Sequence, residues 1–291
     1  MGRTITLVSG KGGVGKTIIT ANLGIALSQA GFSVCLVDTD VAMANLSLLL
    51  NMQSSPITLH DVLLGEAVIH DAIYDGPEGT KVIPSGLSLD TYRRVDTEKL
   101  TQVIRSIHND FDFILLDGPA GIGKDTMASI ASADESILVT TPVSAAIADV
   151  LKTKIVCQRL GNKPFGVILN QVRKEKGEIS DTDVSKMMEL PVFGVYPYNE
   201  NLRKAYLAEK VVPILIKDPT SDFSLAVRKS IKKMTGVEIK TEEKSAGILG
   251  LFKKSASSKE TEALETPEKG EQTETKTIKR GFLDFLKKKK E

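Results

Sequence analysis

The sequence predicts a doubly wound α/β domain, in which a mostly parallel β-sheet is covered by helices on both faces. Short apolar runs bounded by turn residues alternate with longer segments of helical periodicity through about Gly236. The runs are apolar at nearly every position, which is typical of strands buried on both faces of a parallel sheet. The chain has 291 residues, of which 41% are hydrophobic, and this is enough to fill such a core. We therefore expect one domain over residues 1–240.

The first elements form a βαβ unit. A strand is expected at 4–9 (TITLVS), then a helix at 16–31 that Gly31 ends, then a strand at 33–38 (SVCLVD). Aliphatic and β-branched runs predict three more strands, at 111–117 (FDFILLD), 135–141 (ESILVTT) and 165–170 (FGVILN). In such a sheet, ligands bind at the carboxyl ends of the strands.

Composition argues against several classes of protein. Thirty-eight basic and 37 acidic residues give a net charge of +1, so nucleic acid is not expected as a partner. Cys35 and Cys157 stand far apart without a CxxC spacing, which argues against a disulfide scaffold, a zinc site or a bound cluster. No apolar run approaches the roughly 20 residues that span a bilayer, and the start MGRTIT is not a signal peptide. We expect a cytoplasmic protein.

The segment SGKGGVGKT, which follows the first strand, fits two phosphate-binding patterns. In one, Gly10, Gly12 and Gly15 form GxGxxG, and Asp38 ends the next strand where a ribose-binding acid would lie. That pattern would indicate a dinucleotide-binding fold.

In the other pattern, Gly10–Thr17 is GxxxxGK[ST], a phosphate loop of the P-loop NTPase type. Glycines let backbone N–H groups face the phosphates, Lys16 reaches the β- and γ-phosphates, and the Thr17 hydroxyl binds Mg²⁺. Asp117 ends a strongly apolar strand, as a Walker B carboxylate near Mg²⁺ does. A dinucleotide site needs neither the lysine nor the threonine, so the triphosphate interpretation is favoured.

A second lysine, Lys11, gives the loop the signature KGGVGKT. With it the sequence resembles the MinD/ParA branch of the deviant Walker A ATPases from about Arg3 to Gly236. LVDTDVAMANL resembles the second acidic motif of that family, with Asp38 and Asp40, and LLDGPAGIG resembles its Walker B segment. NQV at Asn170 and YPYNENLRKA at Pro197 resemble the segments that contact the adenine base.

The resemblance implies an ATP-dependent homodimer in which Lys11 of each subunit reaches the phosphates of the other. Asp40 would orient the attacking water, while Thr17, Asp38 and Asp117 act on Mg²⁺ and its waters. The implied contacts to ATP are Gly10, Gly12, Gly13, Val14, Gly15, Lys16, Thr17, Ile18, Asn170 and Pro197. An activating or cargo protein is a further implied partner.

Some of these residues also have purely structural interpretations. Asp38 and Asp40 can end a strand and cap a helix, and Asn170 can be an ordinary turn residue after a strand. ATP is preferred over GTP because a guanine site requires Asn-Lys-x-Asp. The Asn-Lys pair at Asn162 is followed instead by Pro164 and Phe165.

The C-terminal part has a different character, with a polar linker at 241–280 that is expected to be disordered. At 281–291 (GFLDFLKKKKE) an amphipathic helix is predicted, with aromatic and leucine side chains on one side and lysines on the other. It resembles the membrane-targeting sequence of MinD proteins and implies binding to an anionic membrane surface at the inner face of the cell. The residues assigned to the membrane are Phe282, Leu283, Phe285, Leu286, Lys287 and Lys288. The alternative is a terminal helix that docks on its own domain.

A second segment, 247–254 (GILGLFKK), repeats the pattern of GFLDFLKK. It is either a second, weaker membrane anchor or a part of the folded domain that packs against its end. The whole sequence thus predicts a MinD-like ATPase in spatial regulation, such as placement of a division site or cell pole. The alternatives are a ParA-type partitioning ATPase or a flagellum-number regulator of the same family. An iron-sulfur carrier would need paired cysteines that the sequence lacks.

Overall fold

Eight strands form one sheet in the computed structural model, which describes residues 2–88, 94–207 and 213–239. Their order is β3-β4-β2-β5-β1-β6-β7-β8, and every neighbouring pair is parallel except β3 with β4. The predicted mostly parallel sheet is confirmed. The strands are β1 (Arg3–Val8), β2 (Val34–Asp38), β3 (Tyr74–Asp75), β4 (Lys81–Ile83), β5 (Phe113–Asp117), β6 (Glu135–Thr140), β7 (Lys163–Val172) and β8 (Val192–Pro197).

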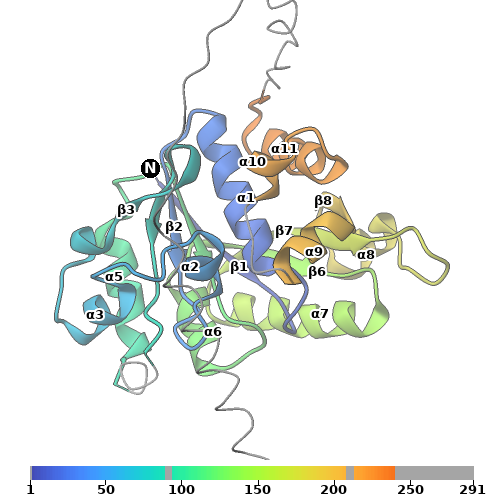
Figure 1. Ribbon diagram of the computed structural model, residues 1–291. Helices are drawn as coiled ribbons and strands as arrows, with labels where there is room; N and C mark the ends of the chain where they lie inside the picture. Colours follow the sequence, from blue (N-terminus) through green and yellow to red (C-terminus); the bar gives the residue numbers. More distant parts are fainter. Residues whose placement is uncertain (1, 89–93, 208–212, 240–291) are drawn as a thin grey trace, which may run out of the picture. The chain divides into compact units, whose positions relative to one another are not determined.

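The helices lie on both faces of the sheet, as predicted (Figure 1). They are α1 (Lys16–Gln29), α2 (Asn45–Leu49), α3 (Leu59–Leu64), α5 (Leu100–Ser106), α6 (Lys124–Ala131), α7 (Ser144–Arg159), α8 (Asp181–Met188), α9 (Glu200–Leu207), α10 (Ile214–Lys217) and α11 (Asp222–Thr235). The described residues also form short 3₁₀ turns at η1 (Ile69–Ala72), η2 (Pro77–Gly79) and η3 (Thr97–Lys99). The expected helix at 16–31 is α1, and Gly31 follows it with φ of +92°.

The core has one apolar layer on each face of the sheet. On β5, Leu115 packs toward α1 and α11, whereas Ile114 and Leu116 pack on the opposite face among residues of α3 and α5. A further cluster on that second face lies between α7 and the strands β6 and β7. Because side chains alternate across a strand, burial on both faces requires apolar residues at consecutive positions. This is the physical origin of the continuous apolar runs in the sequence.

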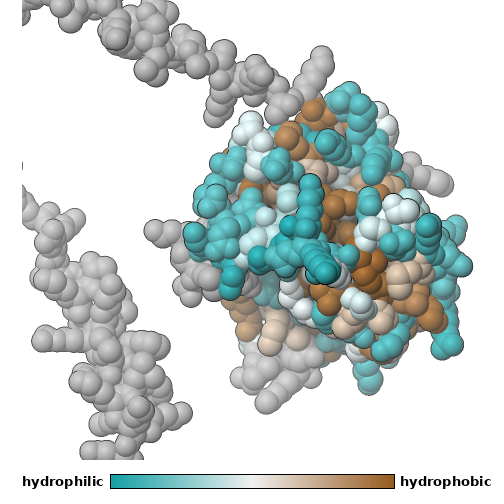
Figure 2. All heavy atoms as spheres, turned by 90° about the vertical axis from the view of Figure 1, so that its right-hand side faces the viewer, coloured by the Kyte–Doolittle hydropathy of each residue, from teal (hydrophilic) through white to brown (hydrophobic). Residues whose placement is uncertain are grey.

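The β8 end of the sheet is an edge. Figure 2 shows this side of the molecule, where hydrophobic surface lies among hydrophilic groups. Along β8 buried and exposed positions mix, and Val195 is 38% exposed. Within the described ranges, no helix is long and apolar enough to cross a membrane. The expectations for 241–280, for 247–254 and for the terminal helix at 281–291 lie outside those ranges.

Candidate functional site

The phosphate loop connects β1 to α1 at the carboxyl edge of the sheet. Gly13 and Gly15 have φ of +79° and +90°, a backbone region that glycine adopts without steric cost. Gly10 has no room for a side chain, because a Cβ there would overlap the backbone of Asp149 on α7. The loop conformation therefore requires glycine at positions 10, 13 and 15.

Lys16, the first residue of α1, lies against the Walker B carboxylate. Its Nζ is 3.7 Å from Oδ1 of Asp117, and the lysine side chain is only 9% exposed. Thr20, one turn further along α1, donates its hydroxyl to the same Oδ1 at 3.1 Å. The structure thus brings together the lysine and the aspartate that the sequence singled out. Thr20 was not predicted, although its spacing of four from Lys16 places both on one side of the helix.

Asp38 and Asp117 lie opposite each other in the register of β2 and β5, and both are fully buried. Asp38 Oδ2 accepts hydrogen bonds from the amide and the hydroxyl of Ser47, at 2.9 and 2.8 Å. Burial, and secondly the neighbouring charge of Asp117, raise the pKa of Asp38 to about 8. Two adjacent carboxylates that are both buried away from solvent need a cation or a proton. Ser47 was missed because nothing in its sequence context marks it.

These residues fit a magnesium ion. Asp117 Oδ2 is buried and has no hydrogen-bond partner in the described part of the chain. The Thr17 hydroxyl, on the first turn of α1, also has none there. The described residues contain no group of three His, Cys, Asp or Glu side chains that could hold a metal alone. A phosphate-loop magnesium site does not need one, because Mg²⁺ keeps several waters and takes phosphate oxygens as ligands.

Asp40 lies in the loop that follows β2 and is half-buried. Its Oδ1 accepts a hydrogen bond from the Met43 amide at 3.0 Å. Burial raises the pKa of Asp40, although that hydrogen bond and the charge of Lys16 partly oppose the shift. The Asp40 carboxylate is therefore close enough to the phosphate loop to interact electrostatically with Lys16.

The carboxyl end of β7 contacts the loop from the other side. Asn170 donates its amide to the Val14 carbonyl at 2.8 Å, and Gln171 donates to the Gly13 carbonyl at 3.0 Å. Pro197 ends the neighbouring strand β8, so the two predicted base-contacting residues lie on adjacent strands at one edge. Asn170 does more than the turn interpretation requires, because it ties β7 to the loop. Gln171 was not predicted, because no motif in the sequence marks it.

The remaining loop residues divide into exposed and packed ones. Lys11, Gly12 and Gly13 are exposed, Val14 is 3% exposed, and Ile18 packs against the core beneath α1. The predicted membrane residues lie outside the described residues.

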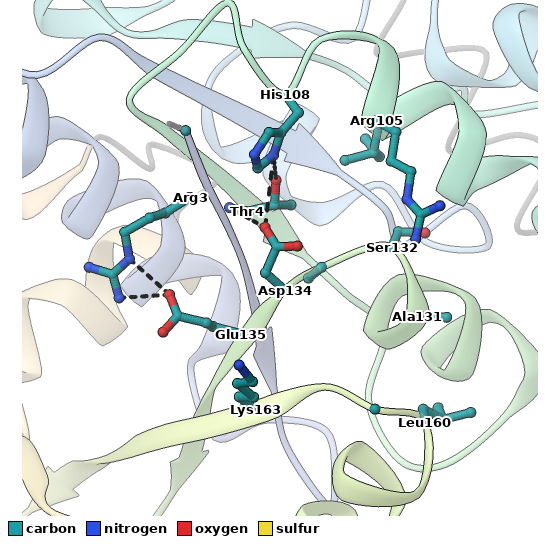
Figure 3. A pocket seen from close by; sticks show the side chains of 14 residues that line it. Arg3, Thr4, Arg105, His108, Ala131, Ser132, Asp134, Glu135, Leu160 and Lys163 are labelled. Carbon is teal, nitrogen blue, oxygen red and sulfur yellow. Dashed lines mark hydrogen bonds and ion pairs between the residues drawn. The ribbon is translucent and has the colours of Figure 1, made fainter.

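A cavity of about 470 Å³ lies at the opposite, amino-terminal edge of the sheet (Figure 3). Side chains that line it lie against one another: Arg3 pairs with Glu135 at 2.7 Å, and His108 lies 3.8 Å from Asp134. None of the phosphate-loop residues lines it. We therefore place the nucleotide site by the loop geometry and not at this cavity.

A glycine loop followed by a helix that begins with lysine, next to two buried carboxylates at strand ends, defines a P-loop nucleoside triphosphatase. A family model described as "ParA: NUBPL iron-transfer P-loop NTPase" matches residues 1–235, and the chain belongs to this ParA/MinD family. It is an ATP-binding protein and an ATP hydrolase of that family. Cys35 and Cys157 are both buried and free, and they lie in different clusters of the core.

Three comparisons describe the similarity. An uncharacterized ATP-binding protein of Methanocaldococcus jannaschii is 42% identical over 259 residues, which cover 87% of this chain and 97% of that protein. A putative septum site-determining protein MinD of Guillardia theta is 32% identical over 245 residues, covering 82% and 90%. The structure of MinD from Pyrococcus horikoshii, in complex with Mg-ADP, has a TM-score of 0.77 at 37% identity and covers 81% of this chain and 96% of that one.

Proposed function

We propose that the chain is a MinD-like ATPase that dimerises with ATP, binds the membrane through 281–291 and is released on hydrolysis. It would act in spatial regulation, such as placement of a division site or cell pole. The observation that carries the proposal is an exposed Lys11 in a phosphate loop that already holds a buried Lys16. The similarity to MinD proteins supports the same function.

The chain's own groups divide the work of hydrolysis. Lys16 and the loop amides hold the phosphates, with Asn170 and Pro197 beside the base. Thr17, Asp38 and Asp117 would hold Mg²⁺, which would supply positive charge to the phosphate oxygens. On nucleotide binding Lys16 would exchange its contact with Asp117 for the phosphates, leaving that carboxylate to the metal.

Asp40 orients the attacking water in this proposal. Its carboxylate is held by the Met43 amide and lies near Lys16, and its raised pKa favours acceptance of a proton. Alignment of a water is worth several powers of ten in rate when the group that aligns it is fixed.

A second copy of the chain completes the site. Three large apolar side chains are exposed on the loops that follow β2, β5 and β6: Met43 at 70%, Ile122 at 53% and Val143 at 52%. These loops share the carboxyl edge of the sheet with Lys11. Exposed apolar groups around a cation indicate a surface that another protein covers. We assign that cover to a second subunit, whose Lys11 then stabilises charge on the phosphates of the first.

The membrane anchor is weak in one copy. Half-burying four large side chains of 281–291 contributes ~4 kcal/mol, and each lysine at an anionic surface contributes about 1 kcal/mol. Ordering a helix too short to form alone opposes this. Two anchors on one dimer raise the avidity by roughly 10²- to 10⁴-fold, so the nucleotide state would control membrane binding.

Size-exclusion chromatography with light scattering tests the dimer. With Mg-ATP we expect a dimer, with Mg-ADP a monomer, and for Lys11→Ala a monomer that still binds ATP. A normal ATP dimer of Lys11→Ala would remove the lysine from the interface. A parallel co-sedimentation with DNA and with liposomes separates this function from that of a ParA-type partitioning ATPase.

A further inference from the structure

His60 is a buried histidine on α3, well outside the phosphate loop. Its side chain is 1% exposed, and its Nε2 lies 2.9 Å from the carbonyl oxygen of Val41. A carbonyl oxygen only accepts hydrogen bonds, so Nε2 carries the hydrogen and donates it. The ring is thus tied to the residue that directly follows Asp40.

The other ring nitrogen has no such partner. Nδ1 is buried without a hydrogen bond among the residues that the structure describes, and it faces Gly86, where a Cβ would overlap the ring. A buried polar atom left unpaired lowers stability, so an apolar side chain would pack here at less cost. The histidine therefore offers something other than packing, namely the single hydrogen bond to Val41.

That hydrogen bond anchors the loop at one point. Val41 is 2% exposed, whereas Met43, two residues later, is 70% exposed. Asp40 lies between this anchor and the end of β2, where its own amide donates to Asp38 at 3.3 Å. The backbone on both sides of Asp40 is thereby held.

The segment after β4 braces the same region. The Leu59 amide, at the start of α3, donates to the Pro84 carbonyl at 2.8 Å. The Ser85 amide donates at 3.0 Å to the Ser47 hydroxyl, which in turn donates to Asp38. Gly86, the next residue, packs directly against the imidazole ring of His60. One short stretch of chain thus supports Asp38 through Ser47 and Asp40 through His60.

We propose that His60 is a positioning residue for ATP hydrolysis, which fixes the Asp40 loop through the carbonyl of Val41. The proposal rests on the role of Asp40 given above. A displacement of about 1 Å at a reacting group costs on the order of 10²-fold in rate, so a partial release of the loop lowers kcat by roughly tenfold. Nucleotide affinity is set by the phosphate loop and stays unchanged.

Two amide variants of the full chain form a matched pair. His60→Gln places an N–H near the position of Nε2, whereas His60→Asn places it near that of Nδ1. We expect His60→Gln to keep most of the single-turnover hydrolysis rate at saturating Mg-ATP, and His60→Asn to fall about tenfold. Both keep the wild-type dissociation constant for ATP. The control His70→Leu, at a surface histidine on η1, keeps both values.

The outcomes separate this inference from the function on which it rests. Equal rates in the Gln and Asn variants, whether both normal or both slow, overturn the role of His60. Wild-type hydrolysis by Asp40→Ala overturns the role of Asp40 itself. If both roles hold, His60→Asn adds no further loss in the Asp40→Ala background, because the two changes act on one group. An added loss there of tenfold overturns the coupling.

Discussion

Replacement of Asp38 by Asn should change how the stability of the nucleotide-free protein depends on pH. Burial and the charge of Asp117 raise the pKa of Asp38 to about 8, against roughly 4 in an unfolded chain. Between pH 5.5 and 7.5 the folded protein therefore holds one proton that the unfolded chain has lost. Stability falls as pH rises wherever the folded state binds more protons.

The magnitude follows from that one proton. The free energy of unfolding falls by up to about 1.4 kcal/mol per pH unit, or about 3 kcal/mol across the window. For a domain of this size this corresponds to a fall in Tm of roughly 5 to 10 °C. His60 acts in the opposite direction, because burial lowers its pKa and it loses stability as pH falls below about 6.5. Because His60 is present in both proteins, its contribution cancels when the wild type is compared with Asp38→Asn.

Differential scanning calorimetry in EDTA without nucleotide measures the slope. The wild type and a surface control, Asp71→Asn, should lose Tm more steeply as pH rises than Asp38→Asn does, because the contributions of Asp40 and His60 are common to all three proteins. The Asn side chain can still accept both hydrogen bonds from Ser47 through its carbonyl oxygen, and it loses the one from the Asp40 amide. An equal slope in wild type and Asp38→Asn would refute the assignment of the proton to the pair Asp38 and Asp117.

Four further predictions concern nucleotide and membrane. Lys16→Ala should abolish ATP binding in equilibrium dialysis, and retained binding would contradict the loop assignment. Asp40→Ala should bind ATP and dimerise but turn over at least tenfold more slowly in a phosphate-release assay. Asn170→Ala should weaken ATP binding about fivefold, from one lost hydrogen bond of about 1 kcal/mol to the loop. In a chain lacking 281–291, serine at the four large apolar positions of 247–254 should reduce residual liposome binding. If liposome binding is unchanged and the thermal stability of the protein falls, 247–254 packs against the folded domain and is not a second anchor.

Much of the site could be predicted from residue types whose structural requirements are known. Gly13 and Gly15 stand where the backbone has a positive φ. Asp38 and Asp117 each end a continuous apolar run, and the two parallel strands that these runs form are neighbours in the sheet. These features are local in sequence, or follow from the sheet that the apolar runs predict.

The parts that were missed depend on contacts between distant segments. Ser47 and His60 reach Asp38 and Val41 across loops whose paths no periodicity describes. The strands β3 and β4 have two and three residues, too few for a pattern, and β8 is an edge strand with mixed burial. Long-range packing decides these elements, and local propensity does not.

The central claim is that ATP controls membrane binding through the terminal segment. Co-sedimentation with liposomes that contain anionic lipid measures it directly, with full-length chain and a chain ending at residue 280, each with Mg-ATP or Mg-ADP. We expect the full chain to pellet with ATP and to pellet little with ADP. The shortened chain should pellet in neither state, apart from any weak binding through 247–254. Equal pelleting of the full chain with ATP and ADP, or ATP-dependent pelleting of the shortened chain at the full level, would contradict the account.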